Sequence, residues 1–282
     1  MSNSASRAEQ RGTWEAAAPG WAKWEQKFSA GLGEVTDVLL DMAGIRPGMR
    51  VLDLACGAGS QTLRAASRVG PTGSVVATDI SANMLEYVRE HARRGAFDNI
   101  TTVECAAEDL DPAQGPYDAA ISRLGLMLFS SPSAALQAVQ RVLKPKARFA
   151  ALVFTAPANN PFAWLPMQIL LRHAGKQPPT SGQPGIFALG GSGVLERLLR
   201  DSGLIDVRTR VVRASLRLAN ASVALQMMQE AFGAYRAVVS DLSEAARADA
   251  WAEVADCIRQ FETGSGFEAE AEFLVGSGAK AG

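Results

Sequence analysis

The sequence contains few cysteines, no long apolar run and no apolar segment of the kind found in signal peptides. Only three cysteines occur among 282 residues, Cys56, Cys105 and Cys257, and their wide spacing argues against a disulfide framework or a zinc site. We therefore expect reduced thiols and no bound metal. No apolar run approaches the ~20 residues that span a bilayer, and the first dozen residues are polar. These absences predict a cytoplasmic protein with a frayed amino terminus and no membrane partner.

An excess of charge of one sign is also lacking. The chain carries 28 Lys and Arg against 29 Asp and Glu, a formal net charge of −1 at pH 7. A protein that follows a phosphate backbone needs a basic stripe, and none stands out here. The sequence therefore predicts no nucleic-acid partner, and the hydrophobic fraction of 48% indicates an ordinary globular protein.

What the sequence does contain is a glycine-rich stretch at residues 50–61, RVLDLACGAGSQ. Its apolar start is typical of a short buried strand, and Gly57 with Gly59 allows a sharp turn and close contact between backbone and ligand. The helix expected from about Ser60 directs its unpaired N–H groups back at this loop. The stretch therefore predicts a ligand site.

Strands and helices alternate after this loop. The apolar runs lack a polar alternation, which is typical of a parallel sheet covered on both faces. The expected fold class is α/β, a Rossmann-like, doubly wound, mostly parallel sheet of seven strands with helical insertions that cap the active site. After the first strand, the others are expected near residues 75–79, 100–105, 117–123, 148–154, 207–212 and 267–275.

The same alternation predicts the organisation of the chain. We expect amino-terminal helices, a ligand-binding core, a helical cap in two insertions and the remainder of the sheet. In that order they are residues 1–48; 49–156; 157–190 and 219–264; 191–218 and 265–282. One or two helices are expected over residues 14–44 and two over 221–262. Three tryptophans in the first of these segments either pack against the core or close over a bound ligand.

Asp79 and Asp53 indicate the kind of ligand. Asp79 lies twenty positions after Gly59 at the end of the second strand, where a carboxylate accepts hydrogen bonds from ribose hydroxyls. Dinucleotide enzymes share this arrangement, but their fingerprint requires a small residue where Thr62 stands here. Asp53 would repel a pyrophosphate and suits a ligand with an ammonium and a sulfonium group. This pattern favours S-adenosylmethionine over NAD, and a nicotinamide oxidoreductase is the less favoured alternative.

Four ordered motifs resemble those of class I S-adenosylmethionine-dependent methyltransferases. Residues 53–59, DLACGAG, resemble the first motif, with Ala55 where that family often has glycine. The later motifs are DISANML at 79–85, YDAAISR at 117–123 and RVLKP at 141–145. The subgroup is similar to the small-molecule methyltransferases of ubiquinone and menaquinone biosynthesis. The resemblance implies methyl transfer to a C, O or N nucleophile of a small, aromatic or polyketide-like metabolite.

The resemblance also implies which residues contact the cofactor. They are Asp53, Ala55, Gly57, Gly59, Asp79, Ile80, Met84, Ala107, Glu108 and Ser122. One departure is Ala106, which stands where such sequences carry an aspartate at the adenine edge, so Glu108 or Asp109 is expected to substitute. Alternatives remain for two of the ten: Asp53 as a structural acid at a helix amino terminus, and Met84 as a core residue.

A proton acceptor is needed only if the nucleophile must first be ionised. The candidates are His173, Glu230 and Tyr235 in the insertions, with Arg123 as an anchor for substrate or carboxylate. His173 is equally explained by the dipole at a helix carboxyl end, and Arg123 by a buried acid that it balances. His91, among charged neighbours, is expected on a solvated helix face.

One further alternative is a protein that binds S-adenosylmethionine without transferring its methyl group. The sequence leaves open the small-molecule acceptor, the methylated atom and the oligomeric state, for which a homodimer is one alternative.

Overall fold

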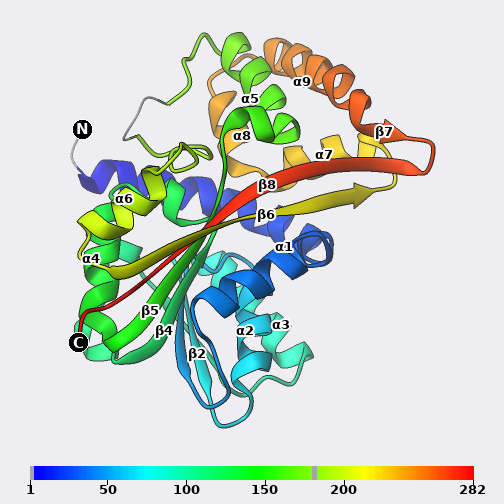
Figure 1. Ribbon diagram of the computed structural model, residues 1–282. Coiled ribbons are helices and arrows are strands. Elements are labelled where there is room, and N and C mark those ends of the chain that lie inside the picture. Colours follow the sequence, from blue (N-terminus) through cyan, green and yellow to red (C-terminus); the bar gives the residue numbers. More distant parts are fainter. Residues whose placement is uncertain (1–2, 180–182) are drawn as a thin grey trace.

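A sheet of eight strands runs through the computed structural model, which describes residues 3–179 and 183–282 (Figure 1). Seven strands follow the order β3-β2-β1-β4-β5-β8-β6, and the short β7 pairs with β8. Strands β1 to β5 are parallel, whereas β8 is antiparallel to both β5 and β6. The predicted mostly parallel, Rossmann-like sheet is confirmed. The strands are β1 (Arg50–Leu54), β2 (Ser74–Asp79), β3 (Ile100–Glu104), β4 (Tyr117–Arg123), β5 (Leu143–Phe154), β6 (Ile205–Leu218), β7 (Glu262–Thr263) and β8 (Gly266–Ala279).

Helices cover both faces of this sheet. Apolar side chains from the second half of α1 (Asn3–Met42) and from α2 (Ser60–Val69) form one buried cluster with the strands, and α3 (Ala82–Arg94) packs beside them. On the other face, α4 (Pro132–Val142) and α6 (Val194–Asp201) build a second cluster. Burial on both sides explains why the central strands are continuously apolar.

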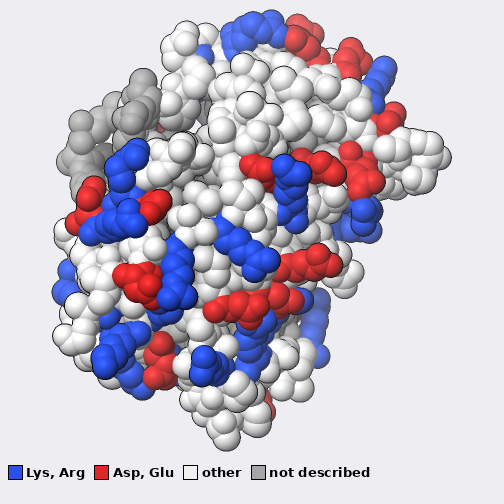
Figure 2. All heavy atoms as spheres, viewed as in Figure 1, with Lys and Arg blue, Asp and Glu red and all other residues white. Residues whose placement is uncertain are grey.

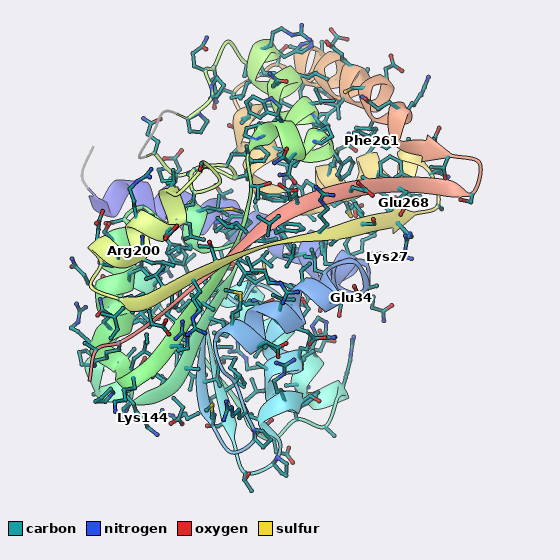
Figure 3. All side chains as sticks on the ribbon, viewed as in Figure 1. Lys27, Glu34, Lys144, Arg200, Phe261 and Glu268 are labelled. Atoms are coloured by element: carbon teal, nitrogen blue, oxygen red, sulfur yellow. The ribbon has the colours of Figure 1, made fainter. Side chains whose placement is uncertain are left out.

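A second layer of helices lies where β6 and β8 extend beyond the other strands (Figure 1). It contains α5 (Pro161–His173), α7 (Ala221–Ala231), α8 (Gly233–Val238) and α9 (Glu244–Ile258). Phe261, labelled in Figure 3, packs edge-on against Phe162 with ring centroids 5.5 Å apart and lies 6.0 Å from Phe267 on β8. These helices therefore share an aromatic core with the projecting ends of the two long strands.

The amino-terminal segment differs from expectation, because it forms one long helix instead of a frayed end followed by shorter helices. Gln10 donates a hydrogen bond to the carbonyl oxygen of Leu128 at 2.9 Å, which connects the first turns of α1 to the 3-10 turn after β4. Farther along, α1 packs so closely against α7 that only glycine fits at position 20. A Cβ there would lie 2.0 Å from the Glu230 carbonyl oxygen. The residues in these contacts lie far apart in the sequence, so no local sequence pattern predicts the contacts.

The segment 221–262 also differs, since it contains three helices where two were expected. The break falls at Phe232, whose φ of −83° and ψ of 83° end α7 and begin α8. Part of the Pro- and Gly-rich region expected between 177 and 185 lies outside the described residues.

Charges of both signs alternate on the face shown in Figure 2. Arg213 pairs with Glu272 at 3.0 Å and Arg217 with Glu268 at 2.7 Å, both between β6 and β8. None of the described helices is long and apolar enough to cross a membrane. Among the side chains of residues 8–179 and 183–282, no cluster of His, Cys, Asp and Glu is arranged to hold a metal ion.

Candidate functional site

The glycine loop lies between β1 and α2 and requires an unusual backbone. Ala55, Gly57 and Gly59 all have positive φ angles, of 52°, 55° and 98°. A Cβ on Gly59 would lie 3.1 Å from Cγ2 of Val88, so a side chain there would also press on α3. At Gly57 no atom lies within 4 Å of the Cβ position, because the loop opens into a cavity. Conformation, and not crowding, therefore favours glycine at position 57.

Asp79 joins the glycine loop to the end of β2. Its Oδ2 accepts a hydrogen bond from the Gly57 N–H at 2.9 Å, and its Oδ1 accepts from the Ser81 N–H at 3.0 Å. Burial raises the pKa of Asp79 to about 6, although the backbone donors of Ser81 and Gly57 lower it. The loop geometry therefore positions this carboxyl group at the cavity wall.

Asp53 lies beneath the loop and is fully buried. It accepts hydrogen bonds from Oγ1 of Thr62 at 2.6 Å and from Nε2 of Gln61 at 3.4 Å, both in the first turn of α2. Burial raises the pKa of Asp53 to about 7, and the Thr62 hydrogen bond and the nearby Arg123 charge oppose this rise. Thr62 stands where a dinucleotide fingerprint needs a small residue, and its side chain makes a buried hydrogen bond to Asp53 there.

A cavity of about 260 Å³ opens beside the loop. Eight of the ten residues expected to contact a cofactor line it, whereas Asp53 and Ser122 lie behind its wall. The eight are Ala55, Gly57, Gly59, Asp79, Ile80, Met84, Ala107 and Glu108. Ala106 lines it too, and Oε1 of Glu108 accepts from the Ser131 N–H at 3.1 Å.

Part of the cavity lining is an aromatic chamber, which we define by Trp21, Phe28, Phe162 and Phe232. Trp21 also packs against the cluster that contains Ala58 and Met84, so the chamber adjoins the glycine loop. The rings of Trp21 and Phe28 lie 4.4 Å apart, and those of Phe28 and Phe232 lie 6.2 Å apart. The Trp21 Nε1 is buried and finds no hydrogen-bond partner among the described residues. The chamber therefore offers an aromatic, apolar surface, with the unpaired Trp21 N–H buried in its wall.

Two of the four residues proposed from sequence for catalysis, Arg123 and Tyr235, line this cavity. The Tyr235 hydroxyl donates to the carbonyl oxygen of Ala163 at 2.5 Å, and burial raises the pKa of the phenol. A phenol that is neutral and already bonded connects α8 to α5, and it is poorly suited to accept a proton.

Glu230 and His173 lie outside the cavity lining. Glu230 accepts hydrogen bonds from Lys23 Nζ and Trp24 Nε1, each at 2.7 Å, and so joins α7 to α1. Burial favours a higher pKa for Glu230, but these donors outweigh it and the pKa is lowered. His173 Nε2 lies 2.9 Å from Oε2 of Glu253, which joins α5 to α9.

Sequence reasoning left open which way the tryptophans of α1 face, and it missed Gln10 and Glu25 as residues of the cavity wall. Gln10, Trp14, Trp21, Glu25 and Phe28 all line it, and their spacings of 4, 7, 4 and 3 residues are those of one helix face. That spacing was the available signal. Of the three tryptophans, Trp14 and Trp21 therefore belong to the cavity wall, whereas Trp24 bonds to Glu230.

His91 corrects another expectation. It was expected on a solvated helix face, but its Nδ1 lies 2.9 Å from the carbonyl oxygen of Ala58 inside the glycine loop. Its charged neighbours Arg89, Arg93 and Arg94 are exposed, so the sequence does not show that the imidazole reaches the loop.

Comparisons with known proteins fit this geometry. A family model described as a methyltransferase domain matches residues 45–169. The chain is 38% identical over 127 residues to the ubiquinone/menaquinone biosynthesis C-methyltransferase UbiE of Haemophilus ducreyi, covering 45% of this chain and 49% of that protein. It is 39% identical over 127 residues to a 2-phytyl-1,4-naphtoquinone methyltransferase of Nostoc sp., covering 45% and 56%. The chain thus spans about half the length of these curated relatives.

Among solved structures, the YcgJ protein of Bacillus subtilis superimposes with a TM-score of 0.58 at 18% identity. The match covers 89% of this chain and 99% of that chain. This likeness shows that the two chains share a fold.

Proposed function

We propose that the whole chain is a class I, S-adenosylmethionine-dependent methyltransferase that acts on a small metabolite. The match of residues 45–169 to a methyltransferase domain and the similarity to UbiE support this. The acceptor is aromatic or polyketide-like, and the methyl group moves to one of its C, O or N atoms by in-line displacement. The observation that carries this proposal is a single cavity that joins the glycine loop to the aromatic chamber.

The residues along the loop fit S-adenosylmethionine. The Asp79 carboxylate is placed to accept from ribose hydroxyls, and the open backbone at Gly57 allows close approach of the methionine portion. Ile80 and Met84 offer apolar surface for the adenine ring. When bound, this cofactor supplies a methyl group already activated on a sulfonium sulfur.

The chain itself must hold the acceptor and exclude water. Trp21, Phe28 and Phe232 provide an aromatic, apolar wall for a ring-containing acceptor. A dry wall favours transfer to an anionic nucleophile, because charge is lost in that transition state. The matched relatives are named for ubiquinone and menaquinone biosynthesis or for 2-phytyl-1,4-naphtoquinone, which supports a ring-containing acceptor here as well.

Calorimetric titration with S-adenosylmethionine, S-adenosylhomocysteine and NAD tests the cofactor. We expect the first two to bind the wild type and Asp79→Ala to weaken them by about 10- to 100-fold, since charge-assisted hydrogen bonds to the ligand are lost. Asp241→Ala, which removes an exposed carboxylate paired with Lys176, is the matched control. Binding of NAD alone would contradict the proposal.

Release of S-adenosylhomocysteine in the presence of hydroquinones, phenols and amines then tests transfer. Turnover with at least one ring-containing acceptor is expected. Tight cofactor binding without turnover on any acceptor class would instead favour a protein that uses S-adenosylmethionine without transferring its methyl group.

A further inference from the structure

Two opposite charges face the cavity beside the glycine loop, one from each side. Glu25 comes from α1 and Arg123 from the end of β4, and both are half-buried. Glu25 lies outside the four motifs named above, whereas Arg123 is the last residue of the motif at 117–123. Arg123 donates to Ser60, the first residue of α2, which places Arg123 at the loop. Glu25 lies on the cavity face of α1, between Trp21 and Phe28 of the aromatic chamber.

Arg123 is held firmly in place. Its Nη1 donates to Oγ1 of Thr36 at 3.1 Å, and its Nη2 donates to Oγ of Ser60. Both hydroxyls are buried. A guanidinium has five N–H groups, so these two bonds fix its plane and leave donors for a ligand carboxylate.

Glu25 reaches the same part of the cavity from α1. The Ser60 hydroxyl accepts from Arg123, and the side chains of both Arg123 and Ser60 are near enough to Glu25 to lower its pKa. Burial raises the pKa of Glu25, while the charges of Arg123 and His91 and the Ser60 hydrogen bond lower it. A carboxylate in such surroundings gains from a cation placed against it.

The two charges attract each other but form no direct ion pair among the described residues. A second opposite pair on the cavity lining, Lys27 and Glu270, is exposed at its rim; Figure 3 labels Lys27 on α1. Water screens charges at the rim, whereas half-buried charges keep most of their interaction. The Glu25 and Arg123 pair is therefore the better site for a charged group.

We propose that Glu25 and Arg123 together bind the amino-acid end of the cofactor, with Glu25 receiving its α-ammonium and Arg123 its α-carboxylate. The two groups of a zwitterion are attached to one carbon, so the protein needs a negative and a positive side chain that face one space. Glu25 and Arg123 provide this, because both line the cavity beside Ser60. The inference rests on the proposed function, and it assigns to α1 a part in cofactor recognition.

Four ligands test the assignment without any methyl acceptor. S-adenosylhomocysteine carries both groups, its deaminated and decarboxylated analogues carry one each, and 5′-methylthioadenosine carries neither. Each is titrated by calorimetry into the wild type, Glu25→Gln, Arg123→Gln and the charge-conserving control Arg123→Lys.

We expect Glu25→Gln to weaken S-adenosylhomocysteine by about 10- to 100-fold, the range for one charge-assisted hydrogen bond, and to leave the deaminated analogue unchanged. Arg123→Gln should weaken S-adenosylhomocysteine to a similar extent and leave the decarboxylated analogue unchanged, and Arg123→Lys should recover part of the loss. Affinity for 5′-methylthioadenosine should stay within about twofold throughout, which also shows that each variant is folded.

Equal losses for S-adenosylhomocysteine and 5′-methylthioadenosine would overturn the inference, because the variants would then have deformed the whole site. Unchanged affinity of Glu25→Gln for S-adenosylhomocysteine would also overturn the inference. The Glu25→Gln titration gives this test even if Arg123→Gln does not fold. Failure of the wild type to bind any of the four ligands would refute the proposed cofactor itself, a result distinct from loss in the variants alone.

Discussion

The imidazole Nδ1 of His91 lies 2.9 Å from the carbonyl oxygen of Ala58, between the two glycines of the cofactor loop. A carbonyl oxygen can only accept, so Nδ1 carries the hydrogen and donates it. The bond connects α3 to a loop whose residues Gly57 and Gly59 have positive φ angles and little intrinsic stiffness. His91 is therefore a positioning residue for the loop.

Loss of this bond should loosen the loop without removing a ligand contact. We expect His91→Ala to weaken S-adenosylhomocysteine by about 3- to 10-fold, which corresponds to one hydrogen bond of ~0.5–1.5 kcal/mol. His91→Asn, whose amide N–H can replace Nδ1–H, should retain most of the affinity. Calorimetry on the three proteins measures this, and equal losses in both variants would argue against the bond.

The buried carboxyls of Asp53 and Asp79 make stability depend on pH. Their pKa values, about 7 and about 6, lie above the ordinary value of 3.8, so the folded chain retains protons that the unfolded chain releases. Their contribution to the free energy of unfolding is therefore largest below about pH 4 and is lost as pH rises toward 7, by at most about 1.4 kcal/mol per pH unit for each carboxyl.

Asp53→Asn removes one of these titrations and keeps an oxygen that can accept from Thr62. Urea unfolding at about pH 5, 6, 7 and 8 should show a smaller decline in the variant than in the wild type. Asp241→Asn, an exposed site, should follow the wild type. Parallel curves for Asp53→Asn and the wild type would contradict the assignment.

The core of the fold and the loop side of the site were predictable because their signals are local. The strand before Gly57 and the acid at position 79 lie within one short segment, where backbone conformation and hydrogen bonding fix their relation. The partners of Glu230 are not local: Trp24 lies 206 residues away and Lys23 lies 207. A helix pattern shows that Glu230 is on a helix, but it cannot show which distant side chains neutralise it.

For the same reason the face of α1 was left undecided. Trp14, Trp21 and Glu25 share one side of a helix by their spacing, which the sequence shows. Whether that side meets a core or a cavity depends on how α1 crosses β6 and α7, and those contacts exist only in the folded chain.

Glu230 was a candidate proton acceptor, and its contacts lead to a different expectation. Glu230→Gln should lower the free energy of unfolding by about 1 kcal/mol, because the hydrogen bonds from Lys23 and Trp24 lose their charge assistance. Cofactor affinity and turnover should stay within about twofold. Lys23→Met, which removes only an exposed ion pair, should cost less, about 0.5 kcal/mol. A large loss of turnover with unchanged stability would instead indicate that Glu230 takes part in the reaction.

Trp21 supplies the sharpest test of the aromatic chamber, because its buried N–H has no partner among the described residues and an unpaired buried donor is costly. An oxygen of the acceptor would satisfy it. With any ring-containing acceptor that bears a carbonyl or hydroxyl group, Trp21→Phe should raise KM about 10-fold and leave the affinity for S-adenosylhomocysteine unchanged.

Trp24→Phe is the matched control for that measurement. It removes the same N–H group three residues along α1, where the donor already bonds to Glu230. This variant should lower stability by about 1 kcal/mol and leave KM unchanged. If both substitutions change stability and neither changes KM, the Trp21 N–H does not contact the acceptor. The apolar ring surfaces of the chamber must then hold the acceptor. A rise in KM confined to Trp21→Phe would instead locate the oxygen of the acceptor at this wall, on the side of the chamber that α1 forms.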